Sequence, residues 1–324
     1  MQFQKVLEII SEDLQDVEAA LKDNTCSDVA LIPLISNYLS GTGGKRIRPI
    51  LVLISSKLCN YHGEKGIVHS CIVEFIHTAT LLHDDVVDGS DLRRGHPSAN
   101  AKWGNEASIL VGDFLFSKSF TLMANHSDIR IMRSLSRACL RMAEGEVMQL
   151  ASHCNLASSE SHYLEVIKRK TAALISSCCQ IGAILGGAPP EQEEALADFG
   201  LRLGVAFQLV DDVLDYSAKE VRLGKPIGKD FNEGKVTLPL IYLYNRCREE
   251  ERAWIGQHLG AGDLGLKELD QLLGWMKSYC ALERAMELAR AQIAQAKERL
   301  SIFEDSLYLE ALRSVADYIG DRDY

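Results

Sequence analysis

The stretch that decides the fold runs from Thr171 to Pro190 and reads TAALISSCCQIGAILGGAPP. It contains no charged side chain, and two glycines and two prolines close it. A membrane span needs about 20 predominantly apolar residues, and the serines, glutamine and glycines make this stretch too polar for one. We interpret it as a helix that is buried on all sides and ends at its Gly-Gly and Pro-Pro pairs. A helix without a solvent face requires a large assembly of other helices around it.

Helical periodicity extends through the rest of the chain. Apolar residues recur at intervals of three and four residues, first at Val6, Ile10, Leu14, Val17 and Leu21. This spacing predicts further helices over residues 50–59, 67–87, 107–124, 129–151, 161–185, 191–216, 238–248 and within 264–324. Residues 88–102 and 217–237 are polar or rich in Gly and Lys, so we expect loops there, the second as a lid. No alternating strand pattern of convincing length and no linker appear, so we predict an all-α protein with a single domain over residues 1–324.

Composition narrows the class of protein. The 324 residues include 35 Lys and Arg against 45 Asp and Glu, a net charge of −10, which does not favour nucleic acid or anionic lipid as the main partner. The nine cysteines are odd in number and show no C-x-x-C spacing, which is typical of small buried side chains in a reducing cytosol. The first 16 residues carry four acids and no basic segment, unlike a signal or transit peptide. We therefore expect a cytoplasmic protein without a transmembrane span.

Two five-residue segments share one pattern of aspartates. They are Asp84-Asp85-Val86-Val87-Asp88 and Asp211-Asp212-Val213-Leu214-Asp215. On a helix the spacing i, i+1, i+4 gathers the carboxylates on one patch, where their like charges need a cation. Oxygen ligands without His or Cys suit Mg²⁺, which also takes phosphate oxygens. A solvated acidic helix end is the alternative for one such segment, but two copies that each follow an apolar run favour a magnesium–diphosphate site.

Basic residues lie near both aspartate segments in the sequence. They are Lys45, Arg46 and Arg48 after a glycine-rich break, Arg93 and Arg94 after the first aspartates, Lys170 before the buried helix, and Lys225, Lys229 and Lys235 after the second aspartates. Arginine binds phosphate through two parallel hydrogen bonds and lysine acts as a point charge. Any one of these residues alone is more often a solvated surface charge. Together they predict two anionic substrates, one bridged by metal and one held by cations.

At these motifs the sequence resembles the trans-prenyltransferases, also called isoprenyl diphosphate synthases, and is most similar to bacterial octaprenyl-type long-chain polyprenyl diphosphate synthases. The matching motifs occur in order over most of the chain. They are GGKRIRP at 43–49, LHDDVVD at 82–88, RRG at 93–95, Gly112-Asp113, Lys170-Thr171, FQLVDDVLD at 207–215, Gly228-Lys229-Asp230 and Gly234-Lys235.

The resemblance implies an isoprenoid synthase fold, an all-α bundle around a central cavity, usually as a homodimer. It implies Mg²⁺-dependent head-to-tail 1′–4 condensation of isopentenyl diphosphate onto an allylic diphosphate, here farnesyl diphosphate, with three Mg²⁺ ions in each loaded active site. The expected product is near C40, octaprenyl diphosphate, which membrane enzymes could take as a quinone side chain or for another lipid.

The resemblance also implies roles for individual residues. Direct Mg²⁺ ligands are expected to be Asp84, Asp88 and Asp211, while Asp85, Asp212 and Asp215 either bind metal directly or support the residues that do. The allylic diphosphate is expected to be held by Arg93, Lys170, Lys225 and Lys235, and isopentenyl diphosphate by Lys45, Arg48, His77 and Arg94. Thr171 belongs to the same substrate-binding set, and Gln208 lines the site near the reacting carbons.

Two histidines precede the first aspartates. His77 lies seven residues, two helical turns, before Asp84 and shares its face, although a buried core histidine is an equal alternative. His83 is adjacent to Asp84 and therefore points about 100° away from it.

Product length is expected to depend on the same helix. Ala79 and Thr80 lie about one turn before Asp84, and in this family a bulky aromatic residue there stops chain growth. Both are small, so growth is expected to continue. Candidate residues for the floor of the tunnel are Phe116, Phe120, Met123 and Leu135, although residues of this kind are more often ordinary core.

Other functions remain open from the sequence. A class I terpene cyclase shares the ionisation chemistry, but it usually carries an Asn/Asp-Ser/Thr-Glu second metal motif. A non-catalytic subunit of a heteromeric synthase typically lacks the aspartates. A structural Ca²⁺ site lacks support from loop spacing. A shorter-chain farnesyl or geranylgeranyl diphosphate synthase is the alternative within the family.

Overall fold

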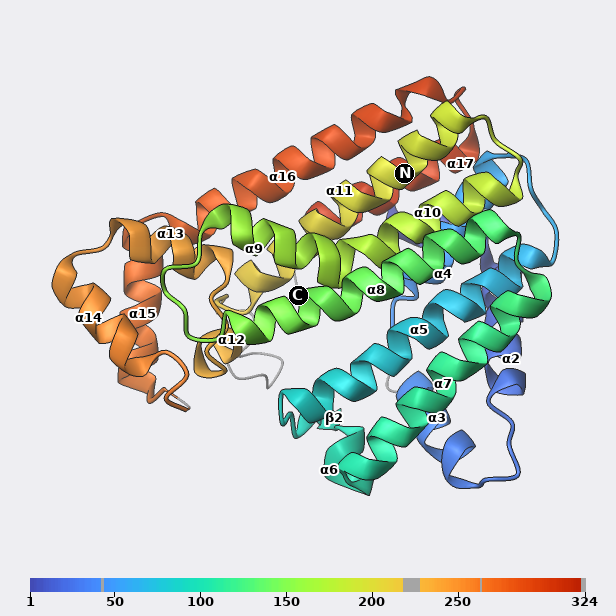
Figure 1. The fold of residues 1–324 in the computed structure, drawn as a ribbon. Helices are drawn as coiled ribbons and strands as arrows, with labels where there is room; N and C mark the ends of the chain where they lie inside the picture. Colours follow the sequence, from blue (N-terminus) through green and yellow to red (C-terminus); the bar gives the residue numbers. More distant parts are fainter. Residues whose placement is uncertain (42–43, 218–227, 263, 322–324) are drawn as a thin grey trace. The chain divides into compact units, whose positions relative to one another are not determined.

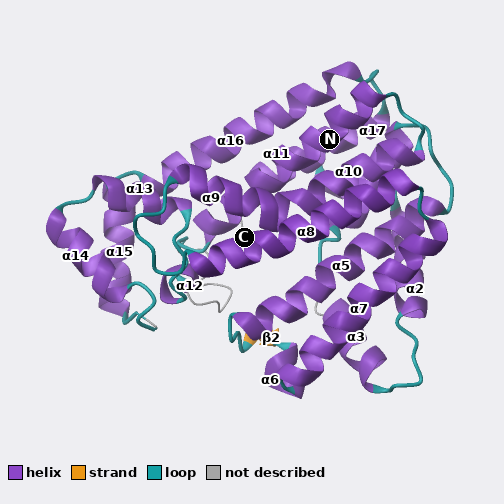
Figure 2. Ribbon diagram, in the orientation of Figure 1, coloured by secondary structure: helices purple, strands orange, loops and turns teal. Residues whose placement is uncertain are grey.

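The computed structural model describes residues 1–41, 44–217, 228–262 and 264–321. Helices make up nearly all of its regular structure (Figures 1 and 2). The first half contains α1 Phe3–Ile9, α2 Ser11–Asn24, α3 Leu31–Gly41, α4 Ile47–Leu58, α5 Lys65–Val87, α6 Ala99–Trp103, α7 Asn105–His126 and α8 Ile129–Ala151. The second half contains α9 Glu160–Ile167, the π-turn η1 Lys168–Ala172, α10 Ala173–Leu185, α11 Pro190–Leu214, α12 Lys229–Asn232, α13 Leu238–Arg246, α14 Glu249–His258, α15 Leu266–Ser278, α16 Ala281–Arg299, the 3₁₀ turn η3 Leu300–Ile302 and α17 Leu307–Gly320.

The chain divides into two compact units. Unit 1 comprises Met1–Cys139, Leu174–Ala197 and Leu300–Val315, and unit 2 comprises Leu140–Ala173, Asp198–Arg299 and Ala316–Tyr324. Each unit therefore gathers segments that are distant in sequence. The single domain predicted over residues 1–324 stays a prediction.

Helix α5 is the central helix of unit 1. It packs against α2, α4, α6 and α7, and Ile72, Ile76 and Leu82 are among its fully buried side chains. The helix ends at the Asp88 C-cap, and Gly89 follows with a φ of 59°, a left-handed conformation that glycine adopts without steric cost. Packing on several sides thus fixes the helix that carries the first aspartates.

The uncharged stretch around α10 is buried as predicted. Leu174, Cys178, Cys179 and Ile181 are at most 1% exposed. A Cβ atom at Gly182 would lie 2.4 Å from the Ser55 Cβ of α4, so the absence of a side chain lets the two helices approach closely. This close contact explains the glycine in the middle of an otherwise apolar helix.

Unit 2 is built around a second set of helices. α13, α15 and α16 pack on one another, and α9 packs on α13. One hydrophobic cluster joins α9, α11, α13 and α16 and contains Tyr163, Leu209, Leu238 and Ala289. A second cluster contains Phe231 and joins α12 to α13, α14 and α15. The two clusters hold the end of α11, which carries the second aspartates.

The all-α prediction is confirmed, and three local predictions need correction. Residues 88–102 are not entirely loop, because they include α6, capped by the Ser98 hydroxyl, and two strands of two residues each, β1 Leu92–Arg93 and β2 His96–Pro97. The helix predicted over 161–185 is interrupted by η1, and the lid region contains α12. Helix α14 was not predicted, because its first turn consists of three glutamates and its short length leaves little apolar periodicity.

By length and composition, one helix among the described residues is apolar enough to cross a membrane. It is α7, and not the uncharged stretch around α10. A core helix passes the same test, and α7 packs along α5 within unit 1.

Candidate functional site

The first aspartates lie at the carboxyl end of α5. Asp85 is 1% exposed, whereas Asp84 and Asp88 are partly exposed. The Arg93 guanidinium binds both oxygens of the Asp85 carboxylate, with its Nε at 2.8 and 2.9 Å and its Nη2 at 2.6 Å. The burial of Asp85 is therefore compensated by a charge-assisted pair. This arrangement separates one supporting carboxylate from two that reach solvent.

Basic residues of unit 1 gather around His77 on α5. The side chain of His77 is mostly buried. Burial, and then the charges of Arg48, Arg94 and Arg93, hold its pKa well below the usual range. The Arg94 guanidinium also lies 3.0 Å from the position of a Cβ at Gly44. Several cations of the predicted isopentenyl diphosphate set therefore lie around one neutral histidine.

Lys45 of this set directly follows the glycines of its motif in the sequence. Lys45 is exposed, at the amino end of α4. Gly43 of the GGKRIRP motif lies outside the described residues.

His83 joins α5 to α7. Its Nε2 lies 3.4 Å from the Asp113 carboxylate and 3.2 Å from the Ile109 carbonyl oxygen. A Cβ at Gly112 would come within 2.4 Å of the same nitrogen, so only glycine leaves room for the ring. The histidine points away from the neighbouring aspartates, as predicted from its position. Its contacts explain why the Gly112-Asp113 pair accompanies the aspartate motif.

The second aspartates end α11 in unit 2. Asp211 is partly exposed, while Asp212 is 4% exposed. Asp215 accepts hydrogen bonds from the backbone N–H groups of Lys229 at 3.2 Å and Asp230 at 3.0 Å. The last carboxylate of the motif thereby fixes the start of α12.

A chain of hydrogen bonds holds Asp212. Thr171 Oγ1 donates to Gln208 Oε1 at 2.8 Å, Gln208 Nε2 donates to Asp212 Oδ1 at 2.8 Å, and the Tyr163 hydroxyl donates to Asp212 Oδ2 at 2.5 Å. Burial, and then the charge of Asp230, raise the pKa of Asp212 to about 8, although the two hydrogen bonds oppose the rise. These hydrogen bonds bring together the three predicted residues Thr171, Gln208 and Asp212. They also include Tyr163, which the sequence did not indicate.

Lys170 lies within the π-turn η1. Its ammonium group is 2.7 Å from the Glu146 carboxylate and 2.6 Å from the Gln149 side-chain oxygen. π-turns inside helices frequently mark functional sites because the extra residue redirects side chains.

The region after the second aspartates is described in part. Lys225 lies outside the described residues. Lys235 binds Glu233 at 2.8 Å, and its backbone N–H donates to the Asp230 carbonyl oxygen at 2.8 Å. This lysine is thus tied to α12, which Asp215 anchors.

The residues expected to set product length occupy different surroundings. Ala79 is fully buried, and the Thr80 hydroxyl donates to the His77 carbonyl oxygen at 2.8 Å. Met123 and Leu135 are buried. Phe116 and Phe120 meet edge to face with centroids 5.0 Å apart, but Phe120 is 43% exposed on α7.

The carboxylates do not form a closed metal cage. Among the residues that the structure describes, no group of three or more His, Cys, Asp or Glu side chains is arranged to hold a metal ion. Mg²⁺ does not require such a cage, because it binds through one or two carboxylates together with waters and substrate phosphates. The partly exposed carboxylates at the end of α5, and separately those at the end of α11, are oxygen donors of the kind that this mode uses.

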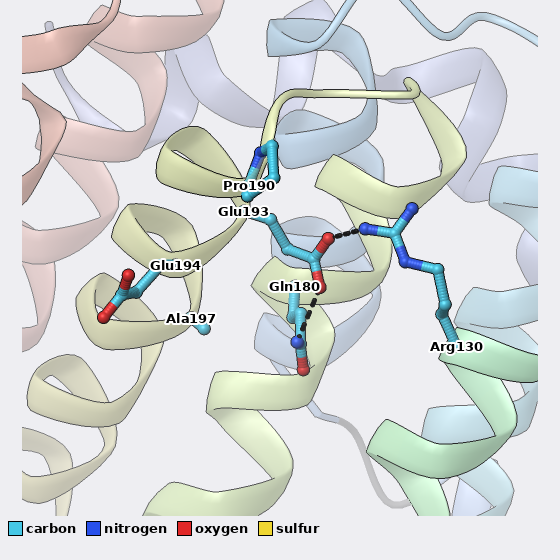
Figure 3. Close-up of a pocket in the computed structure, with 6 residues that line it drawn as sticks. All are labelled: Arg130, Gln180, Pro190, Glu193, Glu194 and Ala197. Atoms are coloured by element: carbon cyan, nitrogen blue, oxygen red, sulfur yellow. Dashed lines mark hydrogen bonds and ion pairs between the residues drawn. The ribbon is translucent and has the colours of Figure 1, made fainter.

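A separate hollow of about 360 Å³ lies among α8, α10 and α11 (Figure 3). In it Arg130 pairs with Glu193, and Gln180 donates to the same carboxylate at 2.9 Å. Its charges are therefore paired with each other. None of the residues that the sequence analysis predicts for a site lines it.

Comparisons with known proteins agree with these motifs. Residues 29–276 match the family model of polyprenyl synthetase. The chain is 39% identical over 323 residues to an octaprenyl diphosphate synthase of Escherichia coli, with full coverage of both. It is 41% identical to a decaprenyl diphosphate synthase of Rhodobacter capsulatus, with a TM-score of 0.93 and 98% coverage of each chain. A Caulobacter crescentus polyprenyl synthase, complexed with calcium and isoprenyl diphosphate, is 39% identical, with a TM-score of 0.94 and coverage of 99% and 98%.

Other relatives differ in the product that they are named for. They include heptaprenyl, nonaprenyl and geranylgeranyl diphosphate synthases. The solved relatives share the all-α isoprenoid synthase fold of this chain. The chain therefore belongs to the polyprenyl synthetase family of trans-prenyl diphosphate synthases, which are prenyltransferases.

Proposed function

We propose that this chain is a long-chain trans-polyprenyl diphosphate synthase that condenses isopentenyl diphosphate with farnesyl diphosphate to a product near C40. One observation carries the proposal. In both aspartate motifs the second residue, Asp85 or Asp212, is buried and bound by protein groups, while the first, Asp84 or Asp211, is partly exposed. Each helix end thus has one carboxylate held by the protein and one that reaches solvent. This arrangement suits the proposed binding of a metal–diphosphate complex by the exposed carboxylates.

The proposed cofactor is Mg²⁺, with three ions when substrate is bound. Asp84, Asp88 and Asp211 would hold the ions, and Asp85, Asp212 and Asp215 would support them through the contacts described above. The calcium in the Caulobacter relative supports a divalent site. When bound, the metal neutralises charge on the allylic diphosphate and so makes it a better leaving group.

The proposed reaction begins when the allylic carbon–oxygen bond breaks and its electron pair leaves with the diphosphate. The double bond of isopentenyl diphosphate attacks the allylic cation, a carbon–carbon bond forms, and the diphosphate removes a proton to give the longer allylic product. Arg93, Lys170, Lys225 and Lys235 are proposed to hold the departing diphosphate. Apolar side chains exclude the water that would quench the cation.

Isopentenyl diphosphate is proposed to bind at Lys45, Arg48, Arg94 and His77. Because the pKa of His77 is lowered, this histidine is neutral at pH 7 and acts as a hydrogen-bond donor. Gln208 and Thr171 are proposed to border the reacting carbons. The hydrogen bond from Gln208 to Asp212 gives its amide a fixed orientation.

The proposed product length rests on Ala79 and on the relatives. Ala79 is fully buried and carries only a methyl group, and we propose that this small side chain lets the product grow along α5. Thr80, Phe116, Met123 and Leu135 remain proposed lining residues, with Phe120 included because it touches Phe116. Octaprenyl and decaprenyl diphosphate synthases among the relatives support a long product.

We also propose that the chain forms a cytoplasmic homodimer. Exposed apolar side chains follow α7 and α8, and a second copy of the chain would cover them. They are Ile109, Leu110, Ile129, Leu140 and Val147. The apolar product is proposed to pass to membrane enzymes, for example as a quinone side chain.

Incorporation of labelled isopentenyl diphosphate tests the proposed function. Wild-type protein with Mg²⁺ and farnesyl diphosphate is expected to form extractable polyprenol after dephosphorylation. A chelator should abolish incorporation, and Asp84→Asn or Asp211→Asn should lower it by about 100-fold. Asp305→Asn is the matched control, because this aspartate is 96% exposed. Metal-independent incorporation, or full activity of Asp84→Asn, would contradict the proposal.

A further inference from the structure

Arg46 lies among the cations of unit 1 but is already bound to two carboxylates. Its Nη1 is 2.6 Å from Glu74 of α5, and its Nε and Nη2 are 2.6 and 3.1 Å from the two oxygens of Glu18 of α2. Glu74 is 7% exposed. Burial alone would lower the pKa of Arg46, but the hydrogen bond to Glu18 and the charges of both glutamates raise it. The guanidinium is thus committed to protein partners.

The backbone at Arg46 is strained. Its φ of 50° lies in the left-handed region, which is sterically unfavourable for a residue other than glycine. Arg46 is also the N-cap of α4, and its carbonyl oxygen accepts the Ile50 N–H at 3.0 Å. A strained conformation persists only where surrounding contacts enforce it, and the two ion pairs supply such contacts.

The position of Glu74 links this strained turn to the cationic cluster. Glu74 and His77 are three residues apart on α5 and therefore lie on the same side of the helix. Arg48 and Arg94 lie near enough to His77 to depress its pKa. The ion pair between Arg46 and Glu74 consequently holds the turn that carries Lys45 and Arg48 next to His77.

We propose that the Arg46–Glu74 ion pair positions Lys45 and Arg48 to bind isopentenyl diphosphate, and that Arg46 is a positioning residue rather than a diphosphate ligand. This inference rests on the proposed function. Charge and positioning predict opposite effects on substrate binding. Removing the negative charge of Glu74 beside a set of cations should by charge alone strengthen binding of an anion, whereas loss of the positioning contact weakens it.

Whether Glu74→Gln raises or lowers the KM for isopentenyl diphosphate therefore tests the inference. Initial rates would be measured with isopentenyl diphosphate varied at saturating farnesyl diphosphate, and then with the two substrates exchanged. Glu74→Gln and Arg46→Gln are each expected to raise the KM for isopentenyl diphosphate about tenfold and to change the KM for farnesyl diphosphate less than twofold. The double variant should be no worse than the poorer single variant, because both remove the same contact.

Matched variants separate positioning from general damage. Glu18→Gln changes the more exposed carboxylate, 50% exposed, and should have a smaller effect than Glu74→Gln. Thermal unfolding of each variant shows whether the chain remains folded. If Glu74→Gln does not fold, Glu74→Asp keeps the charge but shortens the reach, and should still raise the KM for isopentenyl diphosphate selectively.

A lower or unchanged KM for isopentenyl diphosphate in folded Glu74→Gln would overturn the inference. Such a result together with a higher KM in Arg46→Gln would make Arg46 a direct diphosphate ligand. Absence of isopentenyl incorporation by the wild-type protein would instead overturn the proposed function, so the two failures are distinguishable.

Discussion

The guanidinium of Arg93 binds both oxygens of the Asp85 carboxylate at 2.6 to 2.9 Å. The pair reaches from the last turn of α5 into β1 and compensates the burial of Asp85, which is 1% exposed. The ion pair therefore directs the Asp85 carboxylate into the protein. Asp84 and Asp88 remain partly exposed, where the proposed metal ions would bind.

Removing the arginine of this pair should destabilise the protein. Arg93→Gln leaves a buried carboxylate without its counter-ion, so the free energy of unfolding is expected to fall by roughly 3 kcal/mol. Urea unfolding measures the change. The double variant Asp85→Asn, Arg93→Gln should recover part of the loss, because no buried charge remains unpaired. Arg313→Gln is the control, since its pair with Asp305 at 3.7 Å is exposed and worth at most about 1 kcal/mol.

The same variant separates two roles for Arg93. Normal stability of Arg93→Gln would contradict the role of the pair in compensating the burial of Asp85. A much higher KM for the allylic substrate would support the proposed contact of Arg93 with the allylic diphosphate, and an unchanged KM would contradict that contact.

The contact between His83 and Gly112 should be sensitive to one methyl group. Gly112→Ala places a Cβ 2.4 Å from the His83 ring nitrogen, and such overpacking is expected to cost about 1–3 kcal/mol. Activity should fall as well, because His83 precedes Asp84 in the chain and a shift of α5 against α7 would move that carboxylate. His83→Ala in the same chain removes the clash and should restore stability in thermal unfolding. Equal stability of Gly112→Ala and wild type would show that the helices separate without cost.

His77 should make the protein acid-sensitive. Burial and the charges of Arg48, Arg94 and Arg93 lower its pKa in the folded state, whereas the unfolded chain protonates it near pH 6.5. Its contribution to stability is therefore present above about pH 6.5 and is lost as the pH falls toward the lower folded-state pKa. Between pH 7.5 and 5.5, His77→Gln should lose less free energy of unfolding than wild type. Parallel curves for the two proteins would contradict this assignment.

Bulk at Ala79 should shorten the product. Ala79→Phe fills buried space beside α5, one turn before Asp84, and is expected to stop growth at about C15–C20. The dephosphorylated products would be sized by chromatography. Ala291→Phe, at an exposed position on α16, is the control for a new aromatic side chain. An unchanged product in a folded Ala79→Phe protein would place the floor of the tunnel elsewhere.

Local sequence patterns predicted the helices well and the interruptions poorly. Periodicity located α5 and α10, which bury most of their apolar residues, and α8, which buries a narrow stripe at Ile131, Leu135 and Ala138. It did not predict the π-turn at Lys168–Ala172, because the helix that follows is buried nearly all round and has no polar face to show the change of phase. Gly145 of α8 lets the turn approach closely, because a Cβ there would lie 2.5 Å from the Lys170 backbone nitrogen.

The candidate site was predictable where a motif is short and local. The aspartate spacing placed Asp84 and Asp88 on one helix end without structural information. The roles of Tyr163 and Glu74 were not predicted. Their partners lie 49 and 28 residues away in the sequence, and no local pattern encodes such contacts. Both are supporting residues whose role depends on the fold rather than on a motif.

The central claim is tested most directly by sizing the products of one incubation. Purified protein would receive Mg²⁺, farnesyl diphosphate and labelled isopentenyl diphosphate, and the dephosphorylated products would be separated by chain length. The account predicts a ladder of polyprenols that ends near C40. An end point at C15–C20 would contradict the long-chain assignment, and no incorporation at all would contradict the proposed reaction.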